Sequence, residues 1–470
     1  MPRTLTGLVI AVAIVAAVSA SSIAATPESA RLVASDAGST PDPSSEYFGS
    51  FVALSGLVAV IGSGSLGSAY VFEHVGDRWV QSAKLGDSTD ADTKVFAAAI
   101  DGGRIALFYS TSAGSRIGVF EHQGQAWARV ATIVPPPEFE FFTPIDSGSI
   151  ALDGDTLAIG NPYASHADLW DGAAAVYRRG TSGWAVEDVL YVPSDPFYDN
   201  FGASLALQGN RLVVGAPGRI DTSLYAGAAL VYERAGGHWT LVTELHSATP
   251  NFSNRFGNAV ALDGDTLVVT ATDLGRIEIF DRVGGAWTET ARFTSDDTAP
   301  DGISPRSVAI QDGVITVSAY DASSPEKPGV VEAFERVGNV WGRRARLMAS
   351  EVSSNEYFWS AALDGAHVLA GAPGADDGKG AAYVFEVGCA LDPALDPDGD
   401  NLCNADDNCP DTWNPDQADT DGDGLGNECD PASCASVASP PGTSARPAGS
   451  LAPFVIAALA VSRLRKRPIV

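Results

Sequence analysis

The stretch Phe201–Leu245, FGASLALQGNRLVVGAPGRIDTSLYAGAALVYERAGGHWTLVTEL, contains four segments in which apolar and polar residues alternate. Gly209-Asn210 and Gly236-Gly237 separate segments with pairs that are typical of two-residue hairpin turns. Alternation with a period of two indicates β-strands, so the stretch is predicted to form a four-stranded antiparallel meander. One such sheet leaves its faces poorly covered and must pack against further copies.

Six further, uneven copies of this pattern precede Cys389. A tryptophan opens the fourth strand of six copies, about every 50 residues, at Trp79, Trp127, Trp184, Trp239, Trp287 and Trp341. The first strands of all seven copies begin at Phe48, Phe96, Ser147, Phe201, Phe256, Pro305 and Phe358. Four strands in each repeat of this length predict an all-β fold, a seven-bladed β-propeller of four-stranded blades over residues 29–388.

The seventh copy stops after its third strand, AAYVFEVG, and no tryptophan strand follows it. Residues 29–36, SARLVASD, resemble residues 344–351, RARLMASE, which form the fourth strand of copy six. We therefore predict that the N-terminal strand completes the last blade and closes the ring, because a three-stranded blade would expose an unpaired edge.

Phe201-Gly202 with Gly215-Ala216-Pro217, together with similar residues in other copies, resembles the FG-GAP repeat of integrin α-subunit propellers and of many bacterial surface proteins. That resemblance implies a propeller fold, whose loops would form a broad ring surface. Repeats of the integrin type often hold calcium in an acidic loop. No such loop occurs in the seven copies, so these metal sites are not expected here.

The charge composition argues against one class of protein, the nucleic-acid-binding proteins. The net charge is -29 with 58 acidic residues, which argues against nucleic-acid binding because phosphate recognition needs clustered Lys and Arg.

Residues 1–25 carry Arg3, an apolar run at 8–18 and small residues up to Ala25, the pattern of a secretory signal peptide. An exported protein is expected. All five cysteines lie after the repeats, which suggests local disulfides in residues 389–434.

The segment 389–434 carries the strongest chemical signal. Two stretches 23 residues apart place carboxylates at positions 1, 3, 5 and 12, Asn at position 9 and a Leu carbonyl at position 7, as in the calcium loop of an EF-hand. The predicted Ca²⁺ ligands are Asp396, Asp398, Asp400, Leu402, Asn404, Asp407, Asp419, Asp421, Asp423, Leu425, Asn427 and Asp430. Without cations, so many carboxylates would repel each other.

With Asp407-Asn408-Cys409-Pro410, the same segment resembles a thrombospondin type 3 repeat. The resemblance implies a chain wrapped around calcium with almost no apolar core. Cys403 and Cys409 are close enough in sequence for a local disulfide, and Cys429 is left to pair with Cys389 or Cys434.

The C-terminal end has a Ser/Pro/Ala-rich linker at 435–450 and an apolar, then basic, tail at 451–470. Its apolar run is too short for a stable membrane span. Cys434 followed by this tail is similar to the sorting tails of myxobacterial surface proteins, in which the cysteine is the processing or attachment point. A weak membrane anchor is the alternative, and both place the protein at the cell surface or outer envelope, possibly with release to the outside.

These features together predict a surface-displayed calcium-binding protein whose propeller is a binding or adhesion module for an extracellular protein or glycan. An enzyme that acts on an extracellular polymer through the propeller funnel is the competing class, and a purely structural surface layer is a third.

Overall fold

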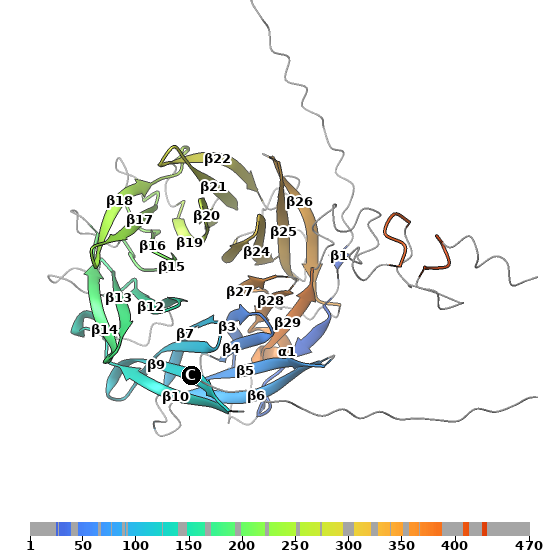
Figure 1. Cartoon of the computed structure of the whole chain (residues 1–470), viewed down its shortest axis with the longest axis horizontal. Coiled ribbons are helices and arrows are strands. Elements are labelled where there is room, and N and C mark those ends of the chain that lie inside the picture. The colour runs from blue at the N-terminus through green and yellow to red at the C-terminus, as the bar shows by residue number, and fades with distance from the viewer. Residues whose placement is uncertain are drawn as a thin grey trace, which may run out of the picture.

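A computed structural model describes residues 25–26, 28–38, 46–387, 408–412 and 425–429. Within 46–387 the gaps are 64–66, 77, 87–89, 91–92, 125, 140–147, 165–170, 193–198, 221–224, 251–253, 273–274, 295–304, 321–327, 339, 351–356 and 366. Seven sheets surround a central axis in Figure 1, which confirms the predicted all-β propeller of four-stranded antiparallel blades. Neighbouring blades touch through their first strands around the whole ring, from β3 against β7 to β27 against β3.

In blades 1 to 6 the four strands of the blade follow the chain from the axis outwards, whereas the outermost strand of blade 7 comes from the N-terminal segment. Blades 1 to 3 consist of β3 (Phe48–Ser55), β4 (Val58–Ser63), β5 (Ser68–Val75) and β6 (Arg78–Gly86); β7 (Lys94–Asp101), β8 (Arg104–Thr111), β9 (Gly114–Gln123) and β10 (Ala126–Ile133); and β11 (Ser149–Asp153), β12 (Thr156–Asn161), β13 (Ala173–Gly180) and β14 (Gly183–Leu190). Blades 4 and 5 consist of β15 (Ser204–Gln208), β16 (Arg211–Ala216), β17 (Ala228–Ala235) and β18 (His238–Leu245); and β19 (Phe256–Asp263), β20 (Thr266–Ala271), β21 (Arg276–Val283) and β22 (Ala286–Thr294).

Blade 6 consists of β23 (Ser307–Gln311), β24 (Val314–Tyr320), β25 (Gly329–Val337) and β26 (Val340–Met348), and blade 7 of β27 (Ser360–Asp364), β28 (His367–Ala372), β29 (Ala381–Glu386) and the N-terminal β2 (Ala30–Leu32). Two short helical turns, η2 (Pro137–Phe139) and α1 (Ala375–Gly378), lie in connections.

The N-terminal segment closes the ring as predicted. β2 pairs antiparallel with β29, with Arg31 opposite Tyr383. Leu32 and Ala34 are buried in the cluster that joins blade 7 to blade 1. A further strand that the sequence did not predict, β1 (Ala25–Thr26), runs parallel to β26 at the outer edge of blade 6. The N-terminal segment thus lies against two adjacent blades.

The repeated Phe-Gly and Gly-Ala-Pro residues form the seams between blades. Phe201 is fully buried at the start of blade 4, and Gly202 has a φ of +91°. A Cβ on Gly202 would lie 2.5 Å from the Ala173 carbonyl oxygen of blade 3. In the next seam a Cβ on Gly215 would collide with the Gly257 carbonyl. These glycines are therefore required because backbones of adjacent blades approach each other closely.

The turns between first and second strands form a second seam. In every blade the last residue of the first strand accepts a hydrogen bond from a backbone N–H in the corresponding turn of the next blade. The seven acceptors are Ser55, Asp101, Asp153, Gln208, Asp263, Gln311 and Asp364. Asp153, Asp263 and Asp364 each precede a glycine in a hairpin turn, and their carboxylates also link neighbouring blades.

Candidate functional site

The two faces of the ring differ in the length of their connections. Turns of two residues, such as Gly209-Asn210 and Gly236-Gly237, join first to second and third to fourth strands on one face, which we name the turn face. The opposite face, the loop face, carries the longer connections such as 162–172, 217–227 and 246–255. Loops held by a rigid scaffold are the usual place for binding residues, so the loop face is the candidate functional surface.

A buried ionic cluster supports the loops between blades 3, 4 and 5. Arg219 donates from Nη1 to Asp199 Oδ2 at 3.0 Å and from Nε to Glu244 Oε1 at 2.9 Å. The Asp199 carboxylate is 3% exposed and Arg219 is 13% exposed. His246 Nε2 lies 3.4 Å from the same Glu244 oxygen. These side chains connect the loop before blade 4, the loop within it and the loop after it.

Burial and pairing move the two carboxyl groups in opposite directions. Burial raises the pKa of Asp199 to about 6, against the opposing effect of Arg219. The hydrogen bond with His246, assisted by Arg219 against the effect of burial, lowers the pKa of Glu244 to about 2. A carboxyl group that titrates near pH 6 makes this loop cluster sensitive to mild acid.

Blade 5 holds a second buried carboxylate near the loop face. Glu278 is fully buried on β21 and accepts a hydrogen bond from Ser247 Oγ at 2.6 Å. Arg292 Nε lies 3.6 Å from the same oxygen. Burial raises the pKa of Glu278. In blade 6, Glu332 is fully buried beside Arg346 at 3.2 Å. Both glutamates pair with an arginine of the adjacent outer strand.

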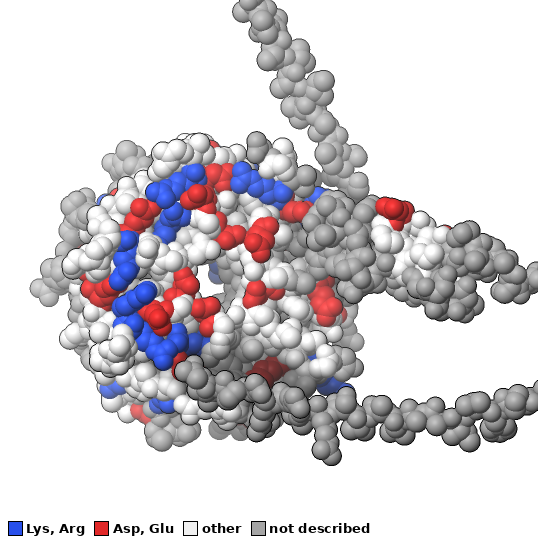
Figure 2. Space-filling model, in the orientation of Figure 1, with Lys and Arg blue, Asp and Glu red and all other residues white. Residues whose placement is uncertain are grey.

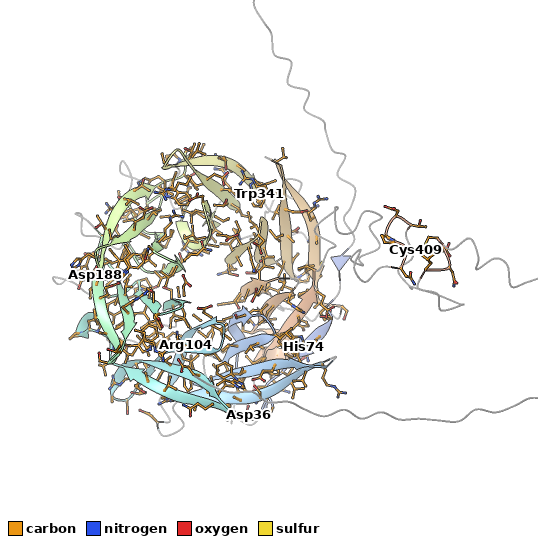
Figure 3. All side chains as sticks on the ribbon, in the orientation of Figure 1. Asp36, His74, Arg104, Asp188, Trp341 and Cys409 are labelled. Atoms are coloured by element: carbon orange, nitrogen blue, oxygen red, sulfur yellow. A yellow bond between two sulfur atoms is a disulfide. The ribbon has the colours of Figure 1, made fainter. Side chains whose placement is uncertain are left out.

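The turn face is lined by tryptophan and ion pairs between blades. Trp239 donates from Nε1 to Glu187 Oε2 of the preceding blade at 3.0 Å, and Arg234 pairs with the same carboxylate. Arg211 lies over the Trp287 ring of the next blade, 5.2 Å from its centroid. In Figure 2, basic and acidic side chains alternate along an arc over blades 3 to 6. Figure 3 shows Arg104, Asp188 and Trp341 in separate blades of this ring.

An open depression on the turn face adjoins this arc. Gln208, Asn210, Arg211, Glu233, Arg234, Gly264 and Asp265 line it. Arg211 is already held there by the Gly264 carbonyl, and Glu233 is paired with Arg282 at 2.9 Å. Because its charges are satisfied within the protein, the depression is best explained as part of the seam between blades 4 and 5.

Two predicted calcium ligands, Leu425 and Asn427, lie in the described turn 425–429, whereas Asp396, Asp398, Asp400, Leu402, Asn404, Asp407, Asp419, Asp421, Asp423 and Asp430 lie outside the described residues. Gly426 N–H donates to the Asn408 carbonyl at 2.9 Å and ties this turn to 408–412. The donor set is carboxylate, carbonyl and amide oxygen, which suits a hard cation such as Ca²⁺. In the part of the chain that the structure describes, no group of three or more His, Cys, Asp or Glu is placed to hold a metal.

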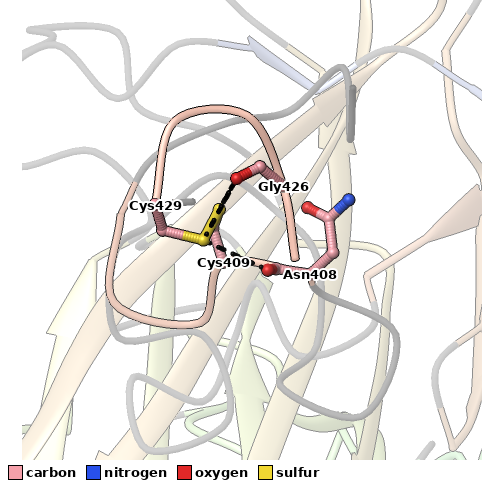
Figure 4. The surroundings of a disulfide bond; sticks show 4 residues. All are labelled: Asn408, Cys409, Gly426 and Cys429. Carbon is pink, nitrogen blue, oxygen red and sulfur yellow. Dashed lines mark hydrogen bonds between the residues drawn. A yellow bond between two sulfur atoms is a disulfide. The ribbon is translucent and has the colours of Figure 1, made fainter. Parts of the chain in front are cut away.

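The disulfide differs from the predicted pairing. Cys409 is bonded to Cys429, with Cα atoms 5.6 Å apart (Figure 4). The predicted pair of Cys403 with Cys409 is therefore wrong, as is the pairing of Cys429 with Cys389 or Cys434. The physical reason is the hydrogen-bonded contact between Gly426 and Asn408, which brings residues 20 apart in sequence together. Cys389, Cys403 and Cys434 lie outside the described residues.

The comparisons with known proteins concern the propeller. Two stretches of the chain match the FG-GAP repeat family, residues 192–232 and 341–385. They contain the Gly-Ala-Pro sequences at 215–217 and 371–373, so the resemblance to FG-GAP repeats is confirmed for these copies. No protein with a curated description matches the chain.

The solved structures that are similar to the chain include two at low sequence identity. Sqt1 of Chaetomium thermophilum is 16% identical, covers 72% of this chain and 81% of its own, and gives a TM-score of 0.44. PpgL, a periplasmic gluconolactonase of Pseudomonas aeruginosa, is 14% identical, covers 70% of this chain and 96% of its own, and gives a TM-score of 0.46. Among the described residues, no helix is long and apolar enough to cross a membrane.

Sequence reasoning did not find the cluster of Asp199, Arg219 and Glu244. Asp199 and Arg219 lie in two different connections and Glu244 lies at the end of β18, and no motif links them. One usable signal was present, since Arg219 lies two residues after the Gly-Ala-Pro of copy four and Asp199 lies two residues before its Phe-Gly. Both positions flank repeat residues that meet at the loop end of blade 4, which is why they lie close together.

Proposed function

We propose that the protein is an exported, cell-surface calcium-binding protein that uses the loop face of its propeller as a binding or adhesion module. The observation that carries the proposal is the segregation of connections, with two-residue turns on one face and the long loops on the other. A closed ring fixes the strand ends from which these loops start, which lowers the entropy lost when a ligand binds.

The remaining parts of the proposal come from the sequence. The acidic segment 389–434 binds Ca²⁺ through Asp398, Asp421 and the other predicted oxygen ligands, and it holds the propeller away from the envelope. The tail 451–470 then associates with the membrane or is processed at Cys434. The partner is an extracellular protein or glycan.

An array of extracellular glycans and proteins, probed with the full exported chain, tests the binding role. A large polymer coupled through a clickable amino acid at position 379, an exposed loop-face residue, should reduce capture of any ligand found. The same polymer at position 283, where Val283 is 63% exposed beside a turn, is the matched control and should leave capture intact. Capture blocked from the turn face alone, or an array without ligands combined with turnover of a polysaccharide, would contradict the proposal.

A further inference from the structure

In blades 6 and 7 a large residue, Arg306 or Trp359, replaces the glycine of the Phe-Gly pair. In blade 4 the Gly202 N–H donates to the Gly215 carbonyl of the second strand at 3.0 Å. Trp359 makes the equivalent bond to Gly371, at 2.9 Å, and Arg306 makes it to Ser318, at 2.9 Å. Each of these two first strands has one residue fewer between this position and its turn. The tight glycine turn is therefore absent, and the position can carry a side chain.

Both large side chains reach solvent at the axial end of the loop face. Trp359 is 50% exposed, and the Arg306 guanidinium lies over its ring, 5.4 Å from the centroid. The two strands are held in register because the Ala361 N–H donates to Ser307 Oγ at 2.7 Å. Blades 1, 4 and 5 carry glycine at this position, as Gly49, Gly202 and Gly257. The pair is thus a local departure from the repeat and not a feature that the fold needs.

The charge of Arg306 is not neutralised within the described part of the chain. Its guanidinium has no hydrogen-bond or ion-pair partner among the described residues and contacts the indole instead. Most arginines of the outer strands and loops are paired, as Arg219 is with Asp199 and Arg234 with Glu187. An exposed aromatic ring beside a guanidinium that no described residue pairs with offers one apolar surface and one bidentate site for a carboxylate.

We propose that Arg306 and Trp359 form a subsite for an acidic sugar, a hexuronate unit of an extracellular polysaccharide. The carboxylate accepts paired hydrogen bonds from the Arg306 guanidinium, and the C–H face of the pyranose ring packs on the Trp359 indole. This inference rests on the proposed binding role of the propeller and names the class of its ligand. The subsite lies where first strands of two blades meet at the axis, so a polymer can continue over the surrounding loops.

The net charge of -29 does not prevent this contact. Repulsion between exposed charges is largely screened beyond about 8 Å at physiological ionic strength. A carboxylate in contact with the guanidinium is inside that distance and is attracted locally. Binding should therefore be stronger in physiological salt than in very dilute buffer, the reverse of the behaviour of a basic protein with an acidic polymer.

Calorimetry and tryptophan fluorescence with trigalacturonate test the subsite on the full chain. We expect binding of trigalacturonate, a change in indole emission, and much weaker binding of its methyl ester. Arg306→Gln should weaken trigalacturonate binding about tenfold and remove the preference over the ester. Trp359→Ala should abolish the binding of both.

The matched controls are Lys379→Gln, which removes an exposed positive charge from the same face, and Tyr225→Ala, which removes an aromatic ring that is 40% exposed in a loop of blade 4. Both should bind as the unmodified protein does, and thermal unfolding of all four variants shows that they are folded. Equal binding of acid and ester, or unchanged binding by Arg306→Gln, would overturn the inference. If the array then finds another ligand that both subsite variants retain, the binding role stands and only the acidic-sugar subsite fails.

Discussion

At the scale of single residues, glycine and aspartate determine how adjacent blades meet. Gly202 lies at a positive φ and against the Ala173 carbonyl, whereas Gly209 lies at a positive φ with open space where a Cβ would be. Gly202 is therefore required both by its φ angle and by the close backbone contact, whereas Gly209 is required by its φ angle alone. Buried ionic groups between the loops add a dependence on pH that the apolar seams do not have.

Gly202→Ala should destabilise the fold by about 3 kcal/mol, because strained φ/ψ values and a backbone collision act together. Gly209→Ala tests the φ angle alone and should lose about 1 kcal/mol. Urea unfolding of both variants measures the difference. Equal losses would show that the blade seam accommodates a methyl group at Gly202.

The pKa of Asp199 leads to a prediction with a definite sign. Its folded value, about 6, lies above the ordinary value of 3.8, so the folded state binds this proton more tightly. Stability from this group therefore rises as pH falls from 7 through 6 towards 4, by about 1–3 kcal/mol. Glu244, with a folded pKa of about 2, acts oppositely, but its contribution is lost only below its unfolded value of 4.5.

Asp199→Asn should remove this rise, measured as the change in the free energy of unfolding between pH 7 and pH 5. Asp265→Asn, which replaces a carboxylate that is 69% exposed on the turn face, is the control and should keep the rise. A rise that persists in Asp199→Asn would mean that other groups produce the pH dependence.

At the scale of elements, the ring depends on a short strand from the N-terminus. β2 supplies the outer edge of blade 7, and Ser29 N–H donates to the Val384 carbonyl across the sheet at 2.8 Å. Removal of residues 29–36 would leave blade 7 with three strands and expose the apolar cluster under Leu32. Deletion should therefore lower the melting midpoint by many degrees.

A single substitution in β2 tests the packing of its side chains without removing its backbone pairing with β29. Leu32→Ala should cost about 2–4 kcal/mol, since Leu32 is buried between blades 7 and 1. The neighbouring Val33 is 41% exposed, and Val33→Ala should cost under about 0.5 kcal/mol. Thermal melts of both proteins provide the comparison, and similar losses would contradict the closure by β2.

The acidic segment gives an element-scale prediction of its own. Calorimetry at millimolar calcium should show uptake of at least two ions by the full chain, lost when Asp398 and Asp421 are replaced by Ala, because each removes a position-3 carboxylate. Asp411→Ala removes a carboxylate of the same segment outside the predicted ligand positions and should keep both sites. An absence of uptake in the unmodified protein would end the calcium proposal.

At the scale of the molecule, the repeat made the fold predictable. Seven first strands, the turns between them and the closing strand could all be located from sequence, because each repeats a local pattern with a fixed period. Contacts between residues that do not occupy equivalent positions in the repeats could not be predicted from the sequence. Asp199 meets Arg219 and Glu244, and Cys409 meets Cys429, through backbone paths that no local pattern encodes. The pair of Arg306 and Trp359 was visible as a departure from Phe-Gly, but its stacking required two blades in position.

Closure by β2 also determines the order in which the molecule can fold. The segment that carries Ser29 is synthesised before the blades, yet its partner Val384 lies 355 residues later. Until β29 exists, β2 has no strand to join, and the ring cannot be completed by local contacts. Such distant pairing slows folding and leaves blade edges open to wrong partners in the meantime. Blades 1 to 6 can form in sequence, and the final step is the docking of β2 onto β29.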